Sequence, residues 1–297
     1  MKALLRHMYR WAATAIAVCG LSLSCQKADD TPVEPEEPTT YEVQVEDFST
    51  TRETMHIGGK LYLPKGRKGP GPAAIFCHGL FGSRNEQEVY ARCAARVGII
   101  AVAFDFCGGP AKGSLSDGTP ADNSVLTEIE DLKAVYMAIT ARPDVDPSRI
   151  IVSGNSQGGL VASLFAVRNP GRVMALNLLY PAFNLPDMVR TALDVLYDGD
   201  IDKMPESLGV GNYSFSQKYV RDAMDLYPFE EIRKFAGPVE ILQGDLDPFV
   251  TPETSEKAAA IFPNANLIVL KDQGHPFDLK GRKEASEYLE TWFREII

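Results

Sequence analysis

Short runs of hydrophobic residues alternate with helical patterns along most of the chain. The first two runs are extended: residues 41–46 alternate at period two, and residues 56–63 are followed by Pro64. Six shorter apolar runs follow, at 73–77, 99–104, 150–153, 175–179, 239–242 and 267–270. Strands that alternate with helices predict an α/β fold, with a mostly parallel central sheet and helices on both faces.

The helical pattern is clear between residues 124 and 142. The apolar residues predicted to share one face of this helix are Leu126, Ile129, Leu132, Val135, Tyr136 and Ile139. Asn123 or Ser124 can cap its start, because both side chains accept hydrogen bonds from backbone N–H groups.

A longer segment, about residues 183–236, separates the strands predicted at 175–179 and 239–242. It has more residues than a simple crossover needs, so we predict an inserted cap. The segment carries seven aromatic residues: Phe183, Tyr197, Tyr213, Phe215, Tyr219, Tyr227 and Phe229. They can line a pocket for an aromatic acyl group, or they can simply pack the cap against the core.

Composition is typical of a globular protein. The 297 residues are 45% hydrophobic and 24% charged, and α/β folds of this length often form one domain. The formal net charge is -10, and the chain has no basic patch to neutralise phosphates. Nucleic-acid binding therefore has no electrostatic support.

The amino-terminal residues have the layout of a secretory signal. Basic residues precede an apolar run at 11–23, which is too short to span a bilayer comfortably. The run ends at Ser24-Cys25 and resembles a bacterial lipoprotein signal, in which cleavage precedes a cysteine that then receives lipid. This resemblance implies a signal peptide at 1–24 and lipidation of Cys25. The alternative is an ordinary signal peptide in which Cys25 is incidental.

Residues 25–40 are acidic and rich in proline, which is typical of a flexible tether. We therefore expect residues 41–297 to form the folded domain. The lipid would hold this domain at a bacterial outer membrane, on the periplasmic side or at the cell surface.

The folded part contains three cysteines, Cys77, Cys93 and Cys107. Because their neighbours are apolar or glycine, we interpret them as small buried hydrophobic residues. A disulfide between Cys77 and Cys107 is the alternative.

The candidate chemistry begins at Gly154-Asn155-Ser156-Gln157-Gly158, where the apolar run 150–153 leads into a helix from Leu160. Gly-x-Ser-x-Gly occurs by chance in a chain of this length roughly one time in ten, so the flanking strand and helix carry the argument. In this context the pattern resembles the nucleophile elbow of the α/β-hydrolase fold, whose glycines permit the sharp turn that exposes the serine. Ser156 is therefore the candidate nucleophile.

A serine hydroxyl needs a base, and the sequence has four histidines. His7 lies in the signal, His56 in the leading strands and His78 at a strand end. The α/β-hydrolase fold uses the chain order Ser, Asp, His, and only His275 follows the serine. His275 is therefore the candidate base.

The imidazole also needs a carboxylate to hold its tautomer and to stabilise its charged form. Asp245 and Asp247 both follow the strand predicted at 239–242. The family pattern Gly-x-x-Asp-x-x-Val selects Asp247 as the acid, and Asp245 is the alternative.

The same fold implies where a developing oxyanion is bound. The run 73–77 leads into His78-Gly79-Leu80. In α/β-hydrolases the backbone N–H after such a His-Gly pair acts together with the N–H after the nucleophile. The implied oxyanion hole consists of the N–H groups of Leu80 and Gln157. His78 is interpreted as a residue that orients this loop, with a second base as the alternative.

These motifs, with Phe104-Asp105-Phe106-Cys107-Gly108-Gly109 and Gly274-His275-Pro276-Phe277, resemble the bacterial cinnamoyl and feruloyl esterases of the α/β-hydrolase superfamily. The resemblance spans about residues 41–297. It departs at Cys107, where relatives usually carry arginine. It implies hydrolysis of hydroxycinnamate esters and of short aryl or alkyl esters, under a cap that shapes the acyl pocket. No metal or organic cofactor is implied.

The expected function is carboxylic ester hydrolysis through an acyl-enzyme on Ser156, with small-molecule esters, plant-derived hydroxycinnamates above all, as substrates. Two alternatives stay open. One is a serine peptidase or amidase of the same fold, and the other is a lipid-anchored binding protein with a vestigial triad. The sequence indicates no oligomeric state.

Overall fold

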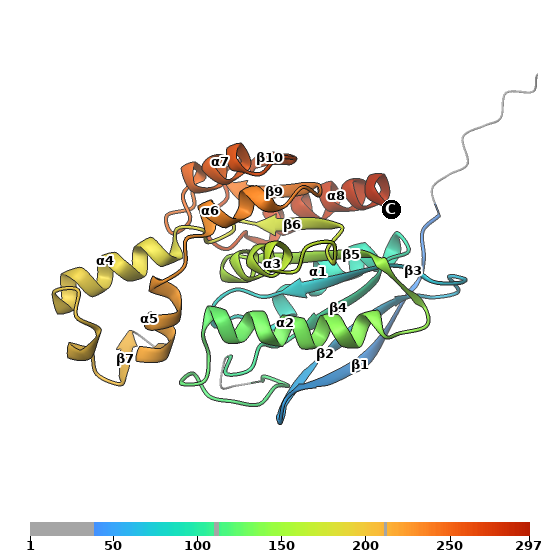
Figure 1. The fold of residues 1–297 in the computed structure, drawn as a ribbon. Coiled ribbons are helices and arrows are strands. Elements are labelled where there is room, and N and C mark those ends of the chain that lie inside the picture. The colour runs from blue at the N-terminus through green and yellow to red at the C-terminus, as the bar shows by residue number, and fades with distance from the viewer. Residues whose placement is uncertain (1–38, 110–112, 211–212) are drawn as a thin grey trace, which may run out of the picture. The chain divides into compact units, whose positions relative to one another are not determined.

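The computed structural model describes residues 39–109, 113–210 and 213–297 (Figure 1). The predicted signal at 1–24, Cys25 and His7 lie outside the described residues, as do residues 25–38 of the predicted tether. None of the helices within the described ranges is long and apolar enough to span a membrane.

The described residues contain one central sheet with the strand order β1-β2-β4-β3-β5-β6-β9-β10. β1 and β2 form an antiparallel hairpin, β2 also runs antiparallel to β4, and the other neighbours are parallel. The strands are β1 (Val43–Arg52), β2 (Met55–Pro64), β3 (Gly71–Cys77), β4 (Ile100–Phe104), β5 (Val145–Asn155), β6 (Ala175–Leu179), β9 (Val239–Gly244) and β10 (Ala265–Leu270). The predicted α/β fold is confirmed, and each predicted strand is present.

Helices cover both faces of the sheet (Figure 1). α2 (Val125–Thr140), α3 (Gln157–Arg168) and α7 (Pro252–Ile261) contribute to one hydrophobic core, and α1 (Glu88–Arg96) and α8 (Leu279–Ile296) contribute to the other. A short 3-10 helix, η1 (Arg84–Glu86), precedes α1. Both faces of β3 and β4 are buried, which explains why these strands are apolar runs without a polar alternation.

Helix α2 begins with a reciprocal cap. Ser124 Oγ accepts a hydrogen bond from Thr127 N at 3.2 Å, and Ser124 N donates to Thr127 Oγ1 at 2.8 Å. The predicted apolar face is correct except at Leu126, which is 36% exposed. This residue lies roughly a third of a turn from the centre of the buried stripe.

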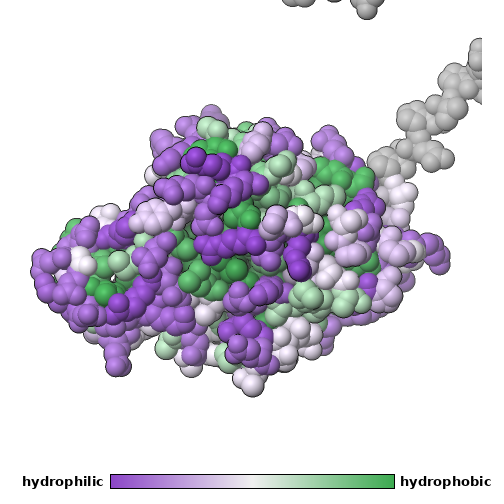
Figure 2. Space-filling model, in the orientation of Figure 1, coloured by the Kyte–Doolittle hydropathy of each residue, from purple (hydrophilic) through white to green (hydrophobic). Residues whose placement is uncertain are grey.

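The segment 183–236, called the insertion below, connects β6 to β9, which are neighbours in the sheet. It contains α4 (Leu185–Tyr197), η2 (Ile201–Lys203), β7 (Ser207–Val210), β8 (Tyr213–Ser216), α5 (Gln217–Met224), α6 (Pro228–Glu231) and η3 (Ile232–Lys234). β7 and β8 pair as an antiparallel hairpin. In the view of Figure 2 the outline of the insertion is mostly hydrophilic, with hydrophobic residues gathered inside it.

The three cysteines of the described chain are buried and free. Their interpretation as small hydrophobic residues is confirmed, and the alternative disulfide between Cys77 and Cys107 is absent. Burial raises the pKa of the Cys77 thiol well above its ordinary value, so the thiol stays protonated at neutral pH.

Candidate active site

Ser156 stands at the sharp turn between β5 and α3. Its backbone has φ 51° and ψ -121°, a conformation that residues with a Cβ rarely adopt. A Cβ on Gly154 would lie 2.3 Å from the carbonyl oxygen of Gly158, and a Cβ on Gly158 would lie 2.4 Å from those of Cys77 and His78. The turn therefore requires glycine at both positions.

Hydrogen bonds from the end of β6 hold this strained turn. Ser156 N donates to Leu179 O at 2.9 Å, and Ser156 O accepts from Ala182 N at 2.9 Å. Because these partners fix the backbone on both sides, the hydroxyl stays partly exposed at the carboxyl end of the sheet.

The structure brings the predicted nucleophile, base and acid together. Ser156 Oγ lies 3.0 Å from His275 Nε2, and His275 Nδ1 lies 2.7 Å from Asp247 Oδ2. The three residues follow β5, β10 and β9, and the carboxyl ends of these parallel strands lie at one edge of the sheet. This arrangement allows the imidazole to accept the serine proton while the carboxylate holds the other ring nitrogen.

Asp247 is 3% exposed, and the carboxylate oxygen that does not contact His275 accepts hydrogen bonds from the backbone. Oδ1 accepts hydrogen bonds from Phe249 N and Val250 N, both at 2.9 Å. The alternative acid, Asp245, instead accepts a hydrogen bond from Gln273 N at 3.2 Å. Of the two candidates, Asp247 thus has the geometry that an orienting acid needs.

Aromatic rings fix the plane of the imidazole. Tyr180 and Phe249 each meet His275 edge to face, with ring centroids 4.8 Å and 5.8 Å away. Burial raises the pKa of Tyr180 well above its ordinary value, so its hydroxyl stays neutral and accepts a hydrogen bond from Asn155 Nδ2 at 3.3 Å.

The two predicted oxyanion donors flank Ser156. Gln157 is the next residue in the chain, and a Cβ on Gly79, the residue before Leu80, would lie 3.2 Å from Ser156 Cβ. Among the described residues, neither backbone N–H has a hydrogen-bond acceptor. Both groups are thus free to donate to a substrate oxygen.

His78 is buried, and both of its ring nitrogens are occupied. Nδ1 lies 2.8 Å from Gly79 O, and Nε2 accepts a hydrogen bond from Phe106 N at 3.0 Å. Burial also lowers its pKa. These contacts favour the role of loop orienter over that of a second base.

Sequence reasoning missed a buried carboxyl group behind the nucleophile turn. Glu128 of α2 is 1% exposed, and its two oxygens accept hydrogen bonds from Gln157 Nε2 at 2.8 Å and Asn123 Nδ2 at 3.0 Å. Burial raises its pKa to about 8. The sequence pattern could have indicated this buried carboxyl group, because the glutamate at position 128 falls on the apolar stripe of α2.

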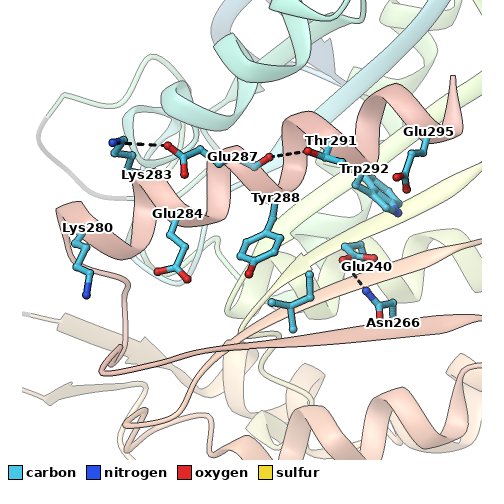
Figure 3. A pocket seen from close by; sticks show the side chains of 11 residues that line it. Glu240, Asn266, Lys280, Lys283, Glu284, Glu287, Tyr288, Thr291, Trp292 and Glu295 are labelled. Atoms are coloured by element: carbon cyan, nitrogen blue, oxygen red, sulfur yellow. Dashed lines mark hydrogen bonds and ion pairs between the residues drawn. The ribbon is translucent and has the colours of Figure 1, made fainter.

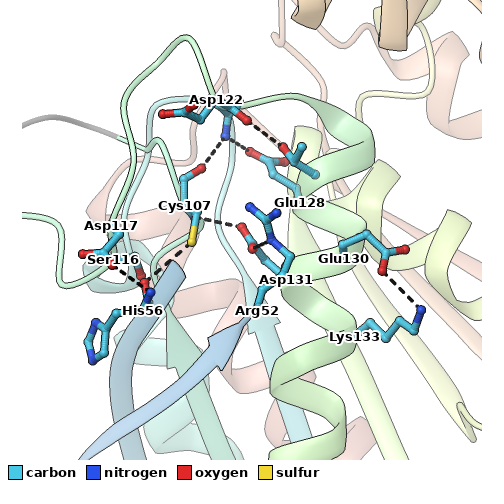
Figure 4. Close-up of polar contacts among 12 residues, drawn as sticks. Arg52, His56, Cys107, Ser116, Asp117, Asp122, Glu128, Glu130, Asp131 and Lys133 are labelled. Carbon is cyan, nitrogen blue, oxygen red and sulfur yellow. Dashed lines mark hydrogen bonds and ion pairs between the residues drawn. The ribbon is translucent and has the colours of Figure 1, made fainter. Parts of the chain in front are cut away.

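A second buried carboxylate, Asp131, lies one turn further along α2 (Figure 4). It accepts hydrogen bonds from Arg52 Nε at 2.5 Å and from Cys107 N at 2.8 Å. Asp131 thereby ties the loop of Cys107, where the sequence departs from the esterase pattern, to both β1 and α2.

The aromatic residues of the insertion differ in what they contact. Phe183 packs against Phe229 and Phe262, at centroid distances of 5.8 Å and 6.1 Å, and so belongs to the core. Phe215 and Tyr219 instead face the loops around Ser156, as described below.

An open groove of about 790 Å³ runs between α8 and the edge strands (Figure 3). Its lining mixes glutamates with Lys280 and Lys283 and includes no candidate catalytic residue. Glu240 and Asn266 are already hydrogen-bonded to each other at 2.9 Å within it. The groove therefore offers no reacting group.

The sequence profile of the prolyl oligopeptidase family matches residues 85–296, more than half of the chain. An uncharacterized protein of Mycobacterium tuberculosis is 29% identical, over 78% of this chain and 73% of its own length. NocK of Nocardia uniformis subsp. tsuyamanensis, described as a putative esterase, is 27% identical over 54% of each chain.

Among solved structures, Est1E from Butyrivibrio proteoclasticus with ferulic acid bound has a TM-score of 0.76 to this chain at 24% identity. The match covers 84% of this chain and 98% of the other. It shows a shared α/β-hydrolase fold. The family match spans the nucleophile turn and the loops of Asp247 and His275, so this hydrolase belongs to the prolyl oligopeptidase family.

Proposed function

We propose that this protein is a carboxylic ester hydrolase that works through an acyl-enzyme. The observation that carries the proposal is the continuous chain of contacts from Ser156 Oγ through His275 to Asp247, at 3.0 Å and 2.7 Å. Such a chain activates a serine hydroxyl, because the imidazole can take its proton and the carboxylate stabilises the resulting imidazolium.

In the first half-reaction, Ser156 Oγ attacks the ester carbonyl carbon as His275 Nε2 removes its proton. The carbonyl oxygen becomes an oxyanion that the N–H groups of Leu80 and Gln157 stabilise. The tetrahedral intermediate then expels the alcohol, which takes the proton from His275, and leaves an acyl group on Ser156. Water repeats these steps and releases the acid.

The favoured substrates are small esters of aromatic acids, of the hydroxycinnamate type, or of short acyl chains. The ferulic acid bound to Est1E, which shares the fold, supports the aromatic class. The seven aromatic residues of the insertion would suit a planar acyl group.

A serine peptidase or amidase is the second candidate, and the match to the prolyl oligopeptidase family supports it. A panel of methyl ferulate, p-nitrophenyl butyrate and aminoacyl anilides separates the two. We expect ester turnover by the wild type, with anilide turnover much lower, and loss of ester turnover in Ser156→Ala. The matched control is Ser148→Ala, which changes an exposed serine outside the candidate site.

Faster cleavage of the anilides than of the esters would assign the protein to the peptidases. Ester turnover that survives in Ser156→Ala would refute the proposed nucleophile. A wild type that cleaves no member of the panel would favour a binding protein with a vestigial triad.

We further propose that the protein is exported and anchored by lipid on Cys25 at a bacterial outer membrane, with residues 25–40 as the tether. The lipoprotein-like run that ends at Ser24-Cys25 supports this proposal. The partner that we propose for the folded part is a small-molecule ester.

A further inference from the structure

The insertion touches both loops that carry the candidate oxyanion donors. Tyr219, on α5, is 3% exposed, and its hydroxyl donates a hydrogen bond to Gln157 Oε1 at 2.5 Å. Phe215, on β8, meets the ring of Phe81 edge to face at 5.3 Å. Phe81 directly follows Leu80, so each donor has one contact to the insertion within a residue of it.

The side chain of Gln157 is held from two sides. Its Nε2 donates to Glu128 on α2 at 2.8 Å, while its Oε1 accepts from Tyr219 on α5 at 2.5 Å. All three side chains are buried, so water cannot replace a lost partner easily. The amide of Gln157 therefore bridges the core of the domain and the insertion.

The two contacts from the insertion form one unit. Phe215 and Tyr219 meet each other edge to face at 5.2 Å. Helix α5 is in turn fixed to the start of α2, because Ser124 Oγ donates to Asp222 Oδ2 at 2.5 Å. A shift of α5 would thus move the partners of both donor loops together.

We propose that the insertion sets the geometry of the oxyanion hole, with Tyr219 and Phe215 as positioning residues for the N–H groups of Gln157 and Leu80. The inference rests on the proposed ester hydrolysis. It gives the insertion a role in the chemical step in addition to any role in choosing the acyl group.

The physical reason lies in the precision that such donors need. They must lie at hydrogen-bond distance from the oxyanion, a position that the ground-state carbonyl oxygen does not occupy. Gln157 is the first residue of α3, so its backbone N–H has no partner within the helix, and Leu80 lies in a loop next to Phe81, whose φ is 56°. Side-chain contacts from the insertion add to the backbone contacts that hold them.

The test compares Tyr219→Phe with wild type on p-nitrophenyl butyrate. The change removes one hydroxyl and keeps the ring. We expect kcat to fall about 5- to 20-fold, less than the loss of a whole oxyanion donor, with KM within twofold of wild type. The matched control is Tyr227→Phe, which removes the hydroxyl of an exposed tyrosine of the insertion and should leave both constants unchanged.

Inhibition by a boronic acid separates a positioning role from a merely structural one, because a structural role would leave the inhibition constant unchanged. Phenylboronic acid forms a tetrahedral adduct with the serine and places an oxygen in the oxyanion hole. Its inhibition constant should rise in Tyr219→Phe by about the same factor as kcat falls. Phe215→Leu provides a second variant that should show the same pattern, and thermal unfolding checks that each variant is folded.

The outcomes separate this inference from the proposed function. If wild type hydrolyses the ester and both folded variants keep its kcat, the inference is wrong and the esterase proposal stands. A rise in KM at unchanged kcat would also overturn it, because it would assign the two side chains to substrate binding. If wild type itself is inactive, the proposed function fails and the positioning role fails with it.

Discussion

At the scale of single residues, backbone strain and side-chain position act together at Ser156. The serine has a positive φ that β6 and two glycines maintain, and its hydroxyl lies 3.0 Å from His275. Strain of this kind persists only where the surrounding contacts determine the conformation. The residue with the strained backbone is thus the one to which we assign the nucleophilic role.

The acid of the triad gives the sharpest test at this scale. Asp247→Asn keeps the shape of the side chain but removes the charge that stabilises the imidazolium. We expect kcat on p-nitrophenyl butyrate to fall about 10³- to 10⁴-fold. Asp245→Asn is the matched control, because Asp245 bonds the backbone of Gln273 and not the imidazole. A larger loss in Asp245→Asn than in Asp247→Asn would reassign the acid.

The sequence selects these candidate residues for a physical reason. The order Ser, Asp, His and the position of each after an apolar run follow from a parallel sheet whose loops meet at one edge. The hydrogen bond between Tyr219 and Gln157 could not be predicted in this way. It joins two side chains 62 positions apart, and only the path of the insertion brings them together.

At the scale of secondary-structure elements, α2 places the carboxyl group of Glu128 in the buried interior. Because burial raises the pKa of Glu128 to about 8, the folded protein binds a proton that the unfolded chain has released. The contribution of Glu128 to the free energy of unfolding is therefore largest below pH 4.5, and it is lost as the pH rises through about 8.

We expect Glu128→Gln to reduce the loss of stability between pH 5 and pH 8, since glutamine does not titrate. For one proton the slope can change by at most about 1.4 kcal/mol per pH unit. Urea unfolding at several pH values between pH 5 and pH 8 measures the slope of the free energy of unfolding against pH. Glu130→Gln, on the exposed side of the same helix, should keep the wild-type slope. An unchanged slope in Glu128→Gln would show that the buried carboxyl group does not titrate as described.

The elements of the sheet and those of the insertion differ in how far the sequence predicts them. Buried strands such as β4 are uninterrupted apolar runs, so their positions follow from the pattern. The predicted run 150–153 covers only part of β5, because the strand begins at Val145 among polar residues. Within the insertion, β7 and β8 have four residues each, too few for a period to appear.

At the scale of the whole molecule, we propose that an amino-terminal signal precedes the α/β-hydrolase domain. Cys25→Ala should abolish lipid attachment, and globomycin should cause the precursor to accumulate. Mass spectrometry of the amino-terminal peptide, with metabolic labelling by palmitate, measures both effects. Efficient cleavage of the Cys25→Ala chain between residues 24 and 25 would instead indicate an ordinary signal peptide.

The order of strands in the sheet explains why residues separated by up to 119 positions form one site. β5, β9 and β10 end at the same edge, and the insertion leaves from β6, between β5 and β9. The insertion therefore begins beside the nucleophile, close to the oxyanion loops that it contacts. Sequence patterns predict that an insertion exists there, but its contacts depend on the fold.

The central claim is that Ser156 is the nucleophile, and covalent trapping tests it most directly. The wild type is treated with a fluorophosphonate, digested and examined by mass spectrometry, beside Ser156→Ala and Ser148→Ala. The account predicts one phosphonate on the peptide that contains Ser156, in wild type and Ser148→Ala and not in Ser156→Ala. Labelling of another residue, or equal labelling of Ser156→Ala, would contradict it.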